Sequence, residues 1–369
     1  MLRRWRPVTE PFGLPPTVGG MTNFSPHHIR RSRCVGTALL AAALFALALG
    51  TPSIRSAKAT GTSFDRSYGW PVAPFNRQHP IRGGFGDPRT VFHAPPTLAG
   101  LYHGSGSFSF HEGVDISAAD GTAVYPVADG TVSSLNSERV FVDSGNGNHF
   151  EYWHITATVR VGDRVTAGKT VLGRIIRGCG HVHLTEVDNG RVTDPLLPGH
   201  LTPYRDATKP YVSLIQLRTD DEAVPLMTNF IRGSVQMYAE AYDTPTLPVP
   251  TPWTDMPMTP AVISYHVETW NGKVKIPETT VWDTRRTIPS NSTFWAHYAR
   301  GTFQNMSVFD KHYSWGQPGS FVFRLGVLNT RRLADSVYRL VVTAKDVRGN
   351  QSSASIRFSV HNKAGWVGV

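Results

Sequence analysis

The sequence of 369 residues predicts an all-β protein, and three observations support this prediction. Apolar residues rarely recur at the three- and four-residue spacing of an amphipathic helix. They alternate instead with polar residues in short runs, as expected for strands with one buried face. Glycine, asparagine, aspartate and proline bound these runs and supply turn residues. The composition, 40% hydrophobic and 17% charged, is typical of folded domains rather than of a disordered chain.

The expected strands follow one another along most of the chain. They are Gly121–Val132, Arg139–Val142, His149–Ile155, His181–Val187, Val262–Glu268, Tyr338–Ala344 and Ala354–Val360. Three turn signals lie at Gly145–Gly147, Asp188–Gly190 and Asn271–Gly272, where Asn and Gly can adopt the positive φ of tight hairpins. The sequence therefore predicts antiparallel strands joined by short turns.

The first 59 residues have the features of an export signal. Arg30, Arg31 and Arg33 precede an apolar run, Val35–Leu49, and the triplet Ala57–Ala59 has the small residues expected at a cleavage site. The run of 15 residues is shorter than the roughly 20 of a typical membrane-spanning helix, although an uncleaved anchor is the alternative. We expect an exported protein that is periplasmic, cell-wall-associated or extracellular, without stable membrane insertion after cleavage.

Most of the positive charge belongs to this segment. Residues 1–59 hold eight of the 37 Lys and Arg and one of the 27 Asp and Glu, so the net charge of the remainder is +3 instead of +10. Nucleic acid is therefore not an expected partner. Of the two cysteines, Cys34 lies in the signal and Cys179 stays alone, so the mature chain can form no internal disulfide.

A change of pattern divides the rest of the chain. Histidines and glycines interleave the strands before residue 207, whereas a Pro-rich patch, Pro245–Pro260, and regular strands follow. We expect a signal peptide at 1–59, one domain at 60–207, a linker at 208–222 and an immunoglobulin-like β-sandwich at 223–369. The aromatic segment Phe294–Tyr298 is interpreted as a packed strand. The tryptophans of the second half are expected in its core: Trp270, Trp282, Trp295 and Trp315.

Three segments of the first half suggest a metal site. His111 and Asp115 are four residues apart, so an extended strand would place both side chains on one face, with Gly113 leaving room between them. His181 and His183 share a face for the same reason. A third strand is expected to end at His154, on the face that also holds Phe150 and Tyr152.

Zinc suits this donor set best, because imidazole nitrogen and carboxylate oxygen are common zinc ligands. A catalytic zinc site uses three protein ligands and keeps a position for water. Five candidates for three places would leave two histidines for acid–base chemistry, which is what a hydrolase needs. Cys179 shares the face of His181 only in a continuous strand, and Gly178 and Gly180 favour a loop there instead.

The order of these motifs resembles the LytM/lysostaphin-type zinc endopeptidases, which cut peptide bonds of bacterial peptidoglycan. The family pattern His-x-x-x-Asp, Tyr-x-His and His-x-His stands here at His111–Asp115, Tyr152–His154 and His181–His183. Flanking segments agree over about residues 80–196, among them Phe85-Gly86 and Ala128–Val132. The resemblance implies a LytM-type antiparallel β-sheet peptidase domain, followed here by the expected sandwich.

The resemblance also implies roles for single residues. His111, Asp115 and His183 would be the zinc ligands, and His154 and His181 the catalytic histidines that do not bind the metal. The sequence departs from the family at Trp153, Cys179-Gly180 and Leu184, which lie next to the motifs and concern the shape of the substrate groove. Asp87, Arg89, Tyr102 and His103 precede the first motif and are further groove candidates.

Two functions follow from these features. The first is an exported zinc metalloendopeptidase with peptidoglycan as its substrate. The alternative is an inactive peptidase-like protein that binds the cell wall or regulates another hydrolase. The residues favour the enzyme because none of the five metal-site and catalytic side chains is missing.

Overall fold

The computed structural model describes residues 67–89, 109–219, 225–251, 253, 254, 256–299, 302 and 321–363. All of them belong to one compact unit, Ala59–Val369. The whole of the expected signal, residues 1–59, lies outside the described residues, as do the groove candidates Tyr102 and His103. None of the helices in the described part of the chain combines the length and the apolar character needed to span a bilayer.

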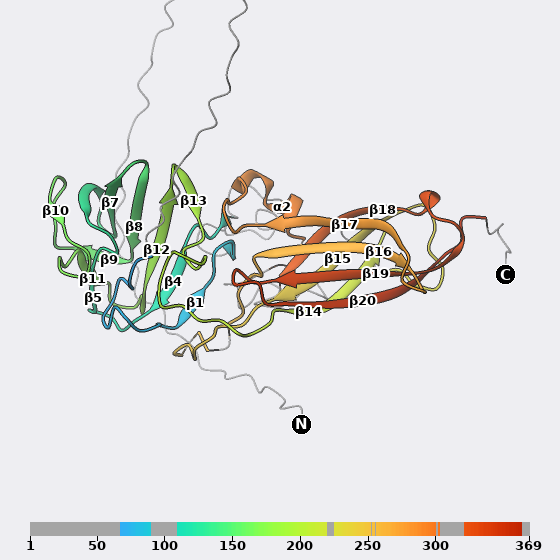
Figure 1. Ribbon diagram of the computed structural model, residues 1–369, viewed down its shortest axis with the longest axis horizontal. Helices are drawn as coiled ribbons and strands as arrows, with labels where there is room; N and C mark the ends of the chain where they lie inside the picture. The colour runs from blue at the N-terminus through green and yellow to red at the C-terminus, as the bar shows by residue number, and fades with distance from the viewer. Residues whose placement is uncertain are drawn as a thin grey trace, which may run out of the picture. The chain divides into compact units, whose positions relative to one another are not determined.

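The protein is nearly all β, as predicted, and the first half is built on one antiparallel sheet (Figure 1). Its strands are β1 (Ile81–Gly83), β4 (Val114–Ser117), β6 (Gly130–Leu135), β7 (Arg139–Gly145), β8 (Asn148–Trp153), β10 (Arg164–Val165), β12 (His181–Asp188) and β13 (Arg191–Thr193). The order in space is β1-β4-β12-β8-β7-β6-β10, and β13 pairs with β12. β12 therefore lies between β4 and β8, the strands that carry or adjoin the other two motifs.

Two smaller groups of strands complete this half. β9 (Ile155–Ala157) and β5 (Ala123–Val124) flank β11 (Gly173–Ile175), while β2 (Pro88–Arg89) pairs with β3 (Ser109–Phe110).

Local sequence explains the hairpins and the alternation. In β8 every second side chain is buried, including Phe150 and Tyr152. Asn146 follows β7 with a φ of 55°, between two glycines of positive φ. Asn189 and Gly190 join β12 to β13 with φ values of 50° and 74°, the conformation of a two-residue hairpin turn. The first two turn predictions are thereby confirmed, and Gly272 in the third predicted turn, Asn271–Gly272, also has a positive φ of 84°.

Two sheets form the second half. One has the order β14-β15-β18 and the other β17-β16-β19-β20. Their bounds are β14 (Tyr211–Arg218), β15 (Ser234–Tyr242), β16 (Val262–Thr269), β17 (Val274–Asp283), β18 (Val322–Asn329), β19 (Ser336–Lys345) and β20 (Gln351–Val360). Residues of both sheets belong to one hydrophobic cluster. The immunoglobulin-like topology and the domain boundaries stay predictions, but the expected linker at 208–222 contains β14, which pairs with β15 along its length.

Some expectations for single elements are wrong. Phe294–His297 forms a short helix, α2, preceded by the 3₁₀ turn η1 (Asn291–Thr293), where we expected a strand. The ring of Phe294 is still buried in the core, so the apolar pattern predicted its burial correctly but its backbone conformation wrongly. Trp282 is buried as expected, whereas Trp270 is 60% exposed because it follows the end of β16 at a turn. Trp315 lies outside the described residues.

Each half has its own core, and each half also contributes side chains to the core of the other. Phe110, at the end of β3, belongs to the core cluster of the second half, although the next residue is the candidate ligand His111. Its ring lies 5.2 Å from that of Phe294 and 5.6 Å from that of Trp282. A backbone bond from Thr259 to Asp87 Oδ1, 2.7 Å long, adds a polar contact. The second half therefore supports the chain beside the candidate site.

Candidate metal centre

The three implied ligands come from neighbouring segments of the sheet. Asp115 on β4 lies directly opposite His183 on β12 in the antiparallel register. His111 precedes β4 and lies outside a strand, so the prediction of one extended strand from His111 to Asp115 is wrong. The segment bends between β3 and β4, and Gly113 in this bend permits a close approach. A Cβ atom there would lie 2.3 Å from the carbonyl oxygen of Leu184.

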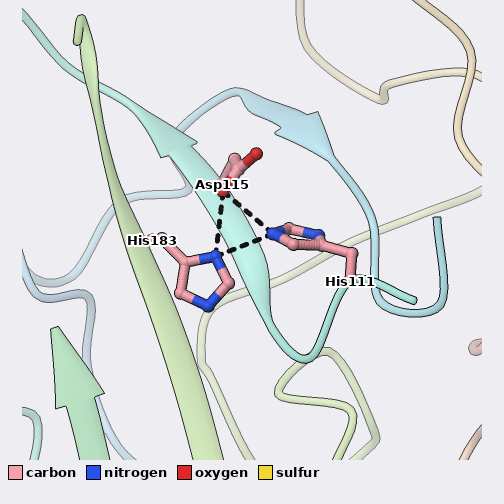
Figure 2. Close-up of side chains that lie close together, drawn as sticks. All are labelled: His111, Asp115 and His183. Carbon is pink, nitrogen blue, oxygen red and sulfur yellow. Dashed lines mark hydrogen bonds and ion pairs between the residues drawn. The ribbon is translucent and has the colours of Figure 1, made fainter. Parts of the chain in front are cut away.

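The three side chains converge on one point (Figure 2). His111 Nε2 lies 3.0 Å from Asp115 Oδ1 and 2.7 Å from His183 Nδ1, and these last two atoms are 3.1 Å apart. His111 and Asp115 are buried, and His183 is partly buried. The three ligand atoms form one of two candidate metal-binding groups among the described residues.

Hydrogen bonds on the far side of each ring direct the ligand atoms inward. Nδ1 of His111 lies 2.7 Å from the carbonyl oxygen of Gly84, which only accepts, so this nitrogen carries the proton and Nε2 carries a lone pair. Nε2 of His183 lies 2.8 Å from the hydroxyl of Thr185. Lone pairs at such distances repel one another unless a cation or a shared proton lies between them. The donor set of two imidazoles and a carboxylate fits zinc.

The charge state of the cluster suits a cation. Burial, helped by the charge of Arg89, lowers the pKa of His111 to about 3. Burial would raise the pKa of Asp115, but the neighbouring His111, His181 and Arg89 hold it well below its usual range. At neutral pH the centre therefore offers a neutral imidazole at His111 and an ionised carboxylate, the forms that bind a metal.

Arg89 holds the carboxylate in place. Its Nη2 donates to Asp115 Oδ2 at 2.8 Å, which leaves Oδ1 facing the histidines. Gly83 makes room for this pair, since a Cβ there would lie 2.7 Å from both Arg89 Nη2 and Asp115 Oδ2. The sequence suggested Arg89 only as a lining residue of the groove. Asp87, also suggested, instead accepts a backbone bond from Gly84 and stabilises the turn after β1.

His154 and His181 lie together beside the cluster. Their ring centroids are 4.5 Å apart, and His181 Nε2 lies 3.5 Å from Asp115 Oδ1. Nδ1 of His181 donates to the carbonyl oxygen of Cys179 at 2.7 Å, so its lone pair is on Nε2. Burial and the charge of Arg82 lower the pKa of His181 to about 4, and burial also lowers the pKa of His154.

The position of His154 differs from the prediction. β8 ends at Trp153, and His154 has a φ of 64°, which breaks the alternation that would have placed it on the face of Phe150 and Tyr152. This left-handed residue connects β8 to β9. Its ring lies against His181 instead of being packed in the core.

Cys179 lies in a turn, as its glycine neighbours predict. It is partly buried, and burial raises the pKa of its thiol. Its sulfur is not in the metal-binding group, but its carbonyl oxygen accepts from both His181 and Arg82. Sequence reasoning missed Arg82, which carried no motif signal, and Thr185, which alternation along the strand could have identified as a neighbour of His183.

An antiparallel β-sheet here presents two histidines and an aspartate around one point, an arrangement that can hold a metal ion. Residues 109–195 match Peptidase family M23, so the chain contains a domain of this family. The match covers β3 to β13 and includes all five predicted site residues. The resemblance to the LytM and lysostaphin peptidases is thereby confirmed for this part of the chain.

Solved structures add distant relatives. The chain is similar to an M23 peptidase from Pseudomonas aeruginosa at 23% identity, covering 37% of this chain and 51% of that one, with a TM-score of 0.25. It is similar to a zinc-containing peptidase from Vibrio cholerae at 22% identity, covering 35% of this chain and 39% of that one, with a TM-score of 0.26. It is also similar to the catalytic domain of lysostaphin from Staphylococcus simulans at 22% identity, covering 31% of this chain and 86% of that one, with a TM-score of 0.23. The chain thus spans about half or less of the length of the first two relatives. No curated protein matches.

Proposed function

We propose that this protein is an exported zinc-dependent endopeptidase that hydrolyses peptide bonds of bacterial peptidoglycan, in stem peptides or cross-bridges. The observation that carries the proposal is the convergence of His111 Nε2, Asp115 Oδ1 and His183 Nδ1 within 3.1 Å of one another. The M23 domain supports the reaction class. Export and the wall substrate rest on the signal-like segment and on the family resemblance.

Each site residue has a proposed role. His111, Asp115 and His183 would hold the zinc ion. A zinc ion bound there would polarise the scissile carbonyl and lower the pKa of a bound water. His181, whose Nε2 lies 3.5 Å from Asp115 Oδ1, would accept the proton of the attacking water, and His154 would act with it as a donor to the leaving amine and to the developing negative charge.

The electrostatics support this division of work. The low pKa of His181 keeps its Nε2 unprotonated at neutral pH, so the ring can accept a proton there. The hydrogen bond from Nδ1 to the carbonyl of Cys179 fixes the ring and its tautomer. Arg89 prevents the carboxylate of Asp115 from rotating away from the ligand atoms.

Two measurements test the proposal. Plasma mass spectrometry should find one zinc per chain in the wild type and almost none in His183→Ala. Digestion of purified peptidoglycan should be abolished by His181→Ala without loss of zinc. His149→Ala is the matched control, since His149 lies on β8 outside the cluster. A wild type that binds zinc but leaves the wall intact would support the inactive wall-binding alternative.

A further inference from the structure

Arg82 brings a guanidinium to the site without a carboxylate partner among the described residues. It lies on β1, the edge strand that pairs with β4. Nη1 donates to the carbonyl oxygen of Cys179 at 3.1 Å, and Nη2 lies 3.3 Å from His181 Nε2. The nearby carboxylate of Asp115 forms its ion pair with Arg89 instead.

Arg139 has a similar stacking contact to that of Arg82, but it also has an acidic partner. The guanidinium carbon of Arg139 lies 4.1 Å from the ring centroid of Trp153, and that of Arg82 lies 4.3 Å from the ring centroid of Trp253. Nη1 of Arg139 also lies 3.8 Å from Oε2 of Glu151. Both arginines stack on a tryptophan, but only Arg139 has an acidic partner in the described chain.

The tryptophan over Arg82 comes from the second half of the chain. Trp253 lies in the Pro-rich segment that follows β15, and the backbones of Asp243 and Met258 pair across the base of this segment at 2.8 and 3.0 Å. The Thr259 backbone then bonds to Asp87 beside β1. These contacts hold Trp253 against one face of the guanidinium, so the N–H groups in its plane are the ones left for a ligand.

The remaining donors of Arg82 are available to an anion. A guanidinium has five N–H groups, and the two contacts to Cys179 and His181 use only two of them. Burial lowers the pKa of Arg82, so the charge is partly removed from water without full compensation. A planar carboxylate matches the guanidinium fork with two parallel hydrogen bonds.

We propose that Arg82, covered by Trp253, binds a free carboxylate of the substrate peptide next to the bond that is cut. The inference rests on the proposed peptidase function and adds the substrate class: peptides with a free carboxylate at this place are preferred over their amidated forms. The carboxylate belongs either to the C-terminus of the stem peptide or to an internal glutamyl residue, and the two sources offer the same pair of oxygens.

The test compares synthetic stem peptides that differ by one amide. One peptide has both carboxylates free, a second is amidated only at the C-terminus, and a third only at the glutamyl residue. Calorimetry with the zinc-loaded full chain carrying His181→Ala measures binding without cleavage. We expect one of the amidated peptides to bind about 10- to 100-fold more weakly than the free acid, which identifies the source.

Variants of the two arginines complete the test. Arg82→Gln in the same background should reduce the ratio of acid to amide affinity to about one, while Arg82→Lys keeps part of it. Arg139→Gln, the matched control, should leave the ratio unchanged. Two results overturn the proposal. The first is equal affinity for acid and amide peptides in the His181→Ala protein with Arg82 intact. The second is a ratio of acid to amide affinity that is unchanged by Arg82→Gln.

Cleavage by the wild type separates this inference from the proposed function. If the wild type cuts none of the peptides, the proposed function fails, and the calorimetric ratio still decides about Arg82. If Arg82→Gln in an otherwise wild-type chain lowers kcat equally for acid and amide while their affinities are equal, Arg82 stabilises charge in the reaction without recognising a carboxylate. That result also overturns the proposal.

Discussion

Arg89 donates from Nη2 to Oδ2 of Asp115 at 2.8 Å, while Oδ1 of the same carboxylate lies 3.0 Å from His111 Nε2. The two oxygens of one side chain thus face a fixed cation on one side and the imidazoles on the other. Replacing a residue that orients a metal ligand in this way typically lowers metal affinity about 10- to 100-fold.

Arg89→Gln should therefore weaken zinc binding about 10- to 100-fold, because Asp115 loses the partner that fixes its rotamer. Competition with a fluorescent zinc chelator measures the change. Arg285→Gln is a suitable control, since Arg285 forms a similar pair with Asp283 at 2.6 Å on an exposed surface outside the cluster. Equal zinc affinity of the Arg89 variant and the wild type would contradict the role given to Arg89.

Thr185 should matter for the same metal through His183. Its hydroxyl lies 2.8 Å from His183 Nε2, so Thr185→Val removes the hydrogen-bond partner that orients the ring with Nδ1 toward the metal centre. We expect about a tenfold loss of zinc affinity, with the fold retained. Thr343→Val is the matched control, because it also removes a 2.8 Å bond between side chains, here to Ser353 on the second-half sheet. A loss of the same size in both variants would count against a specific effect.

The stability of the metal-free protein should depend on pH through the buried histidines. The pKa falls from 6.5 to about 3 at His111 and to about 4 at His181, mainly because of burial. Between about pH 6.5 and 4 the unfolded chain therefore binds more protons, so the free energy of unfolding falls as the pH falls. The slope is about 1.4 kcal/mol per pH unit for each histidine.

Urea unfolding of chelator-treated protein at several pH values measures this slope. His111→Asn removes one of the two groups and should make the slope shallower, whereas His149→Ala should leave it unchanged, since His149 lies outside the cluster. An identical slope in His111→Asn and the wild type would show that His111 does not titrate in this way.

The sequence predicted the strands, and which side chains come close together, better than the backbone geometry between them. Alternation placed β8 and β12 correctly, because one residue per face is a local property of a strand. The bend at Gly113 and the left-handed His154 could not be predicted from alternation, since both depend on contacts with β12 and its neighbours. The contact between Trp253 and Arg82 joins residues far apart in the sequence, so no local sequence pattern predicts it.

Gly113 should be required both for the fold and for the metal. Gly113→Ala would place a Cβ 2.3 Å from the Leu184 carbonyl oxygen and 2.8 Å from His183 Nε2, so β4 and β12 must separate locally. We expect a loss of about 1–3 kcal/mol of stability together with a loss of zinc affinity. Gly130→Ala makes a similar clash, 2.4 Å from the Asp143 carbonyl oxygen, on strands away from the cluster. It should lose stability alone, and loss of zinc in both would point to general unfolding.

Phe110 should couple the second half to the metal centre. Its ring is 2% exposed in the second-half core, and its backbone leads directly to His111. Phe110→Ala should cost about 3–5 kcal/mol of stability and also lower zinc affinity, because His111 loses the anchor that precedes it. Deleting the chain from residue 222 onward removes the same anchor, so the site should not survive that truncation unchanged.

Phe358→Ala separates the two effects of Phe110→Ala. Phe358 lies in the same core, fully buried on β20, so its truncation should cost a similar amount of stability. It is far along the chain from every candidate ligand, and zinc affinity at a temperature where both variants are folded should then fall only in Phe110→Ala. Equal zinc affinities in the two variants would mean that the second half stabilises its own core without positioning His111.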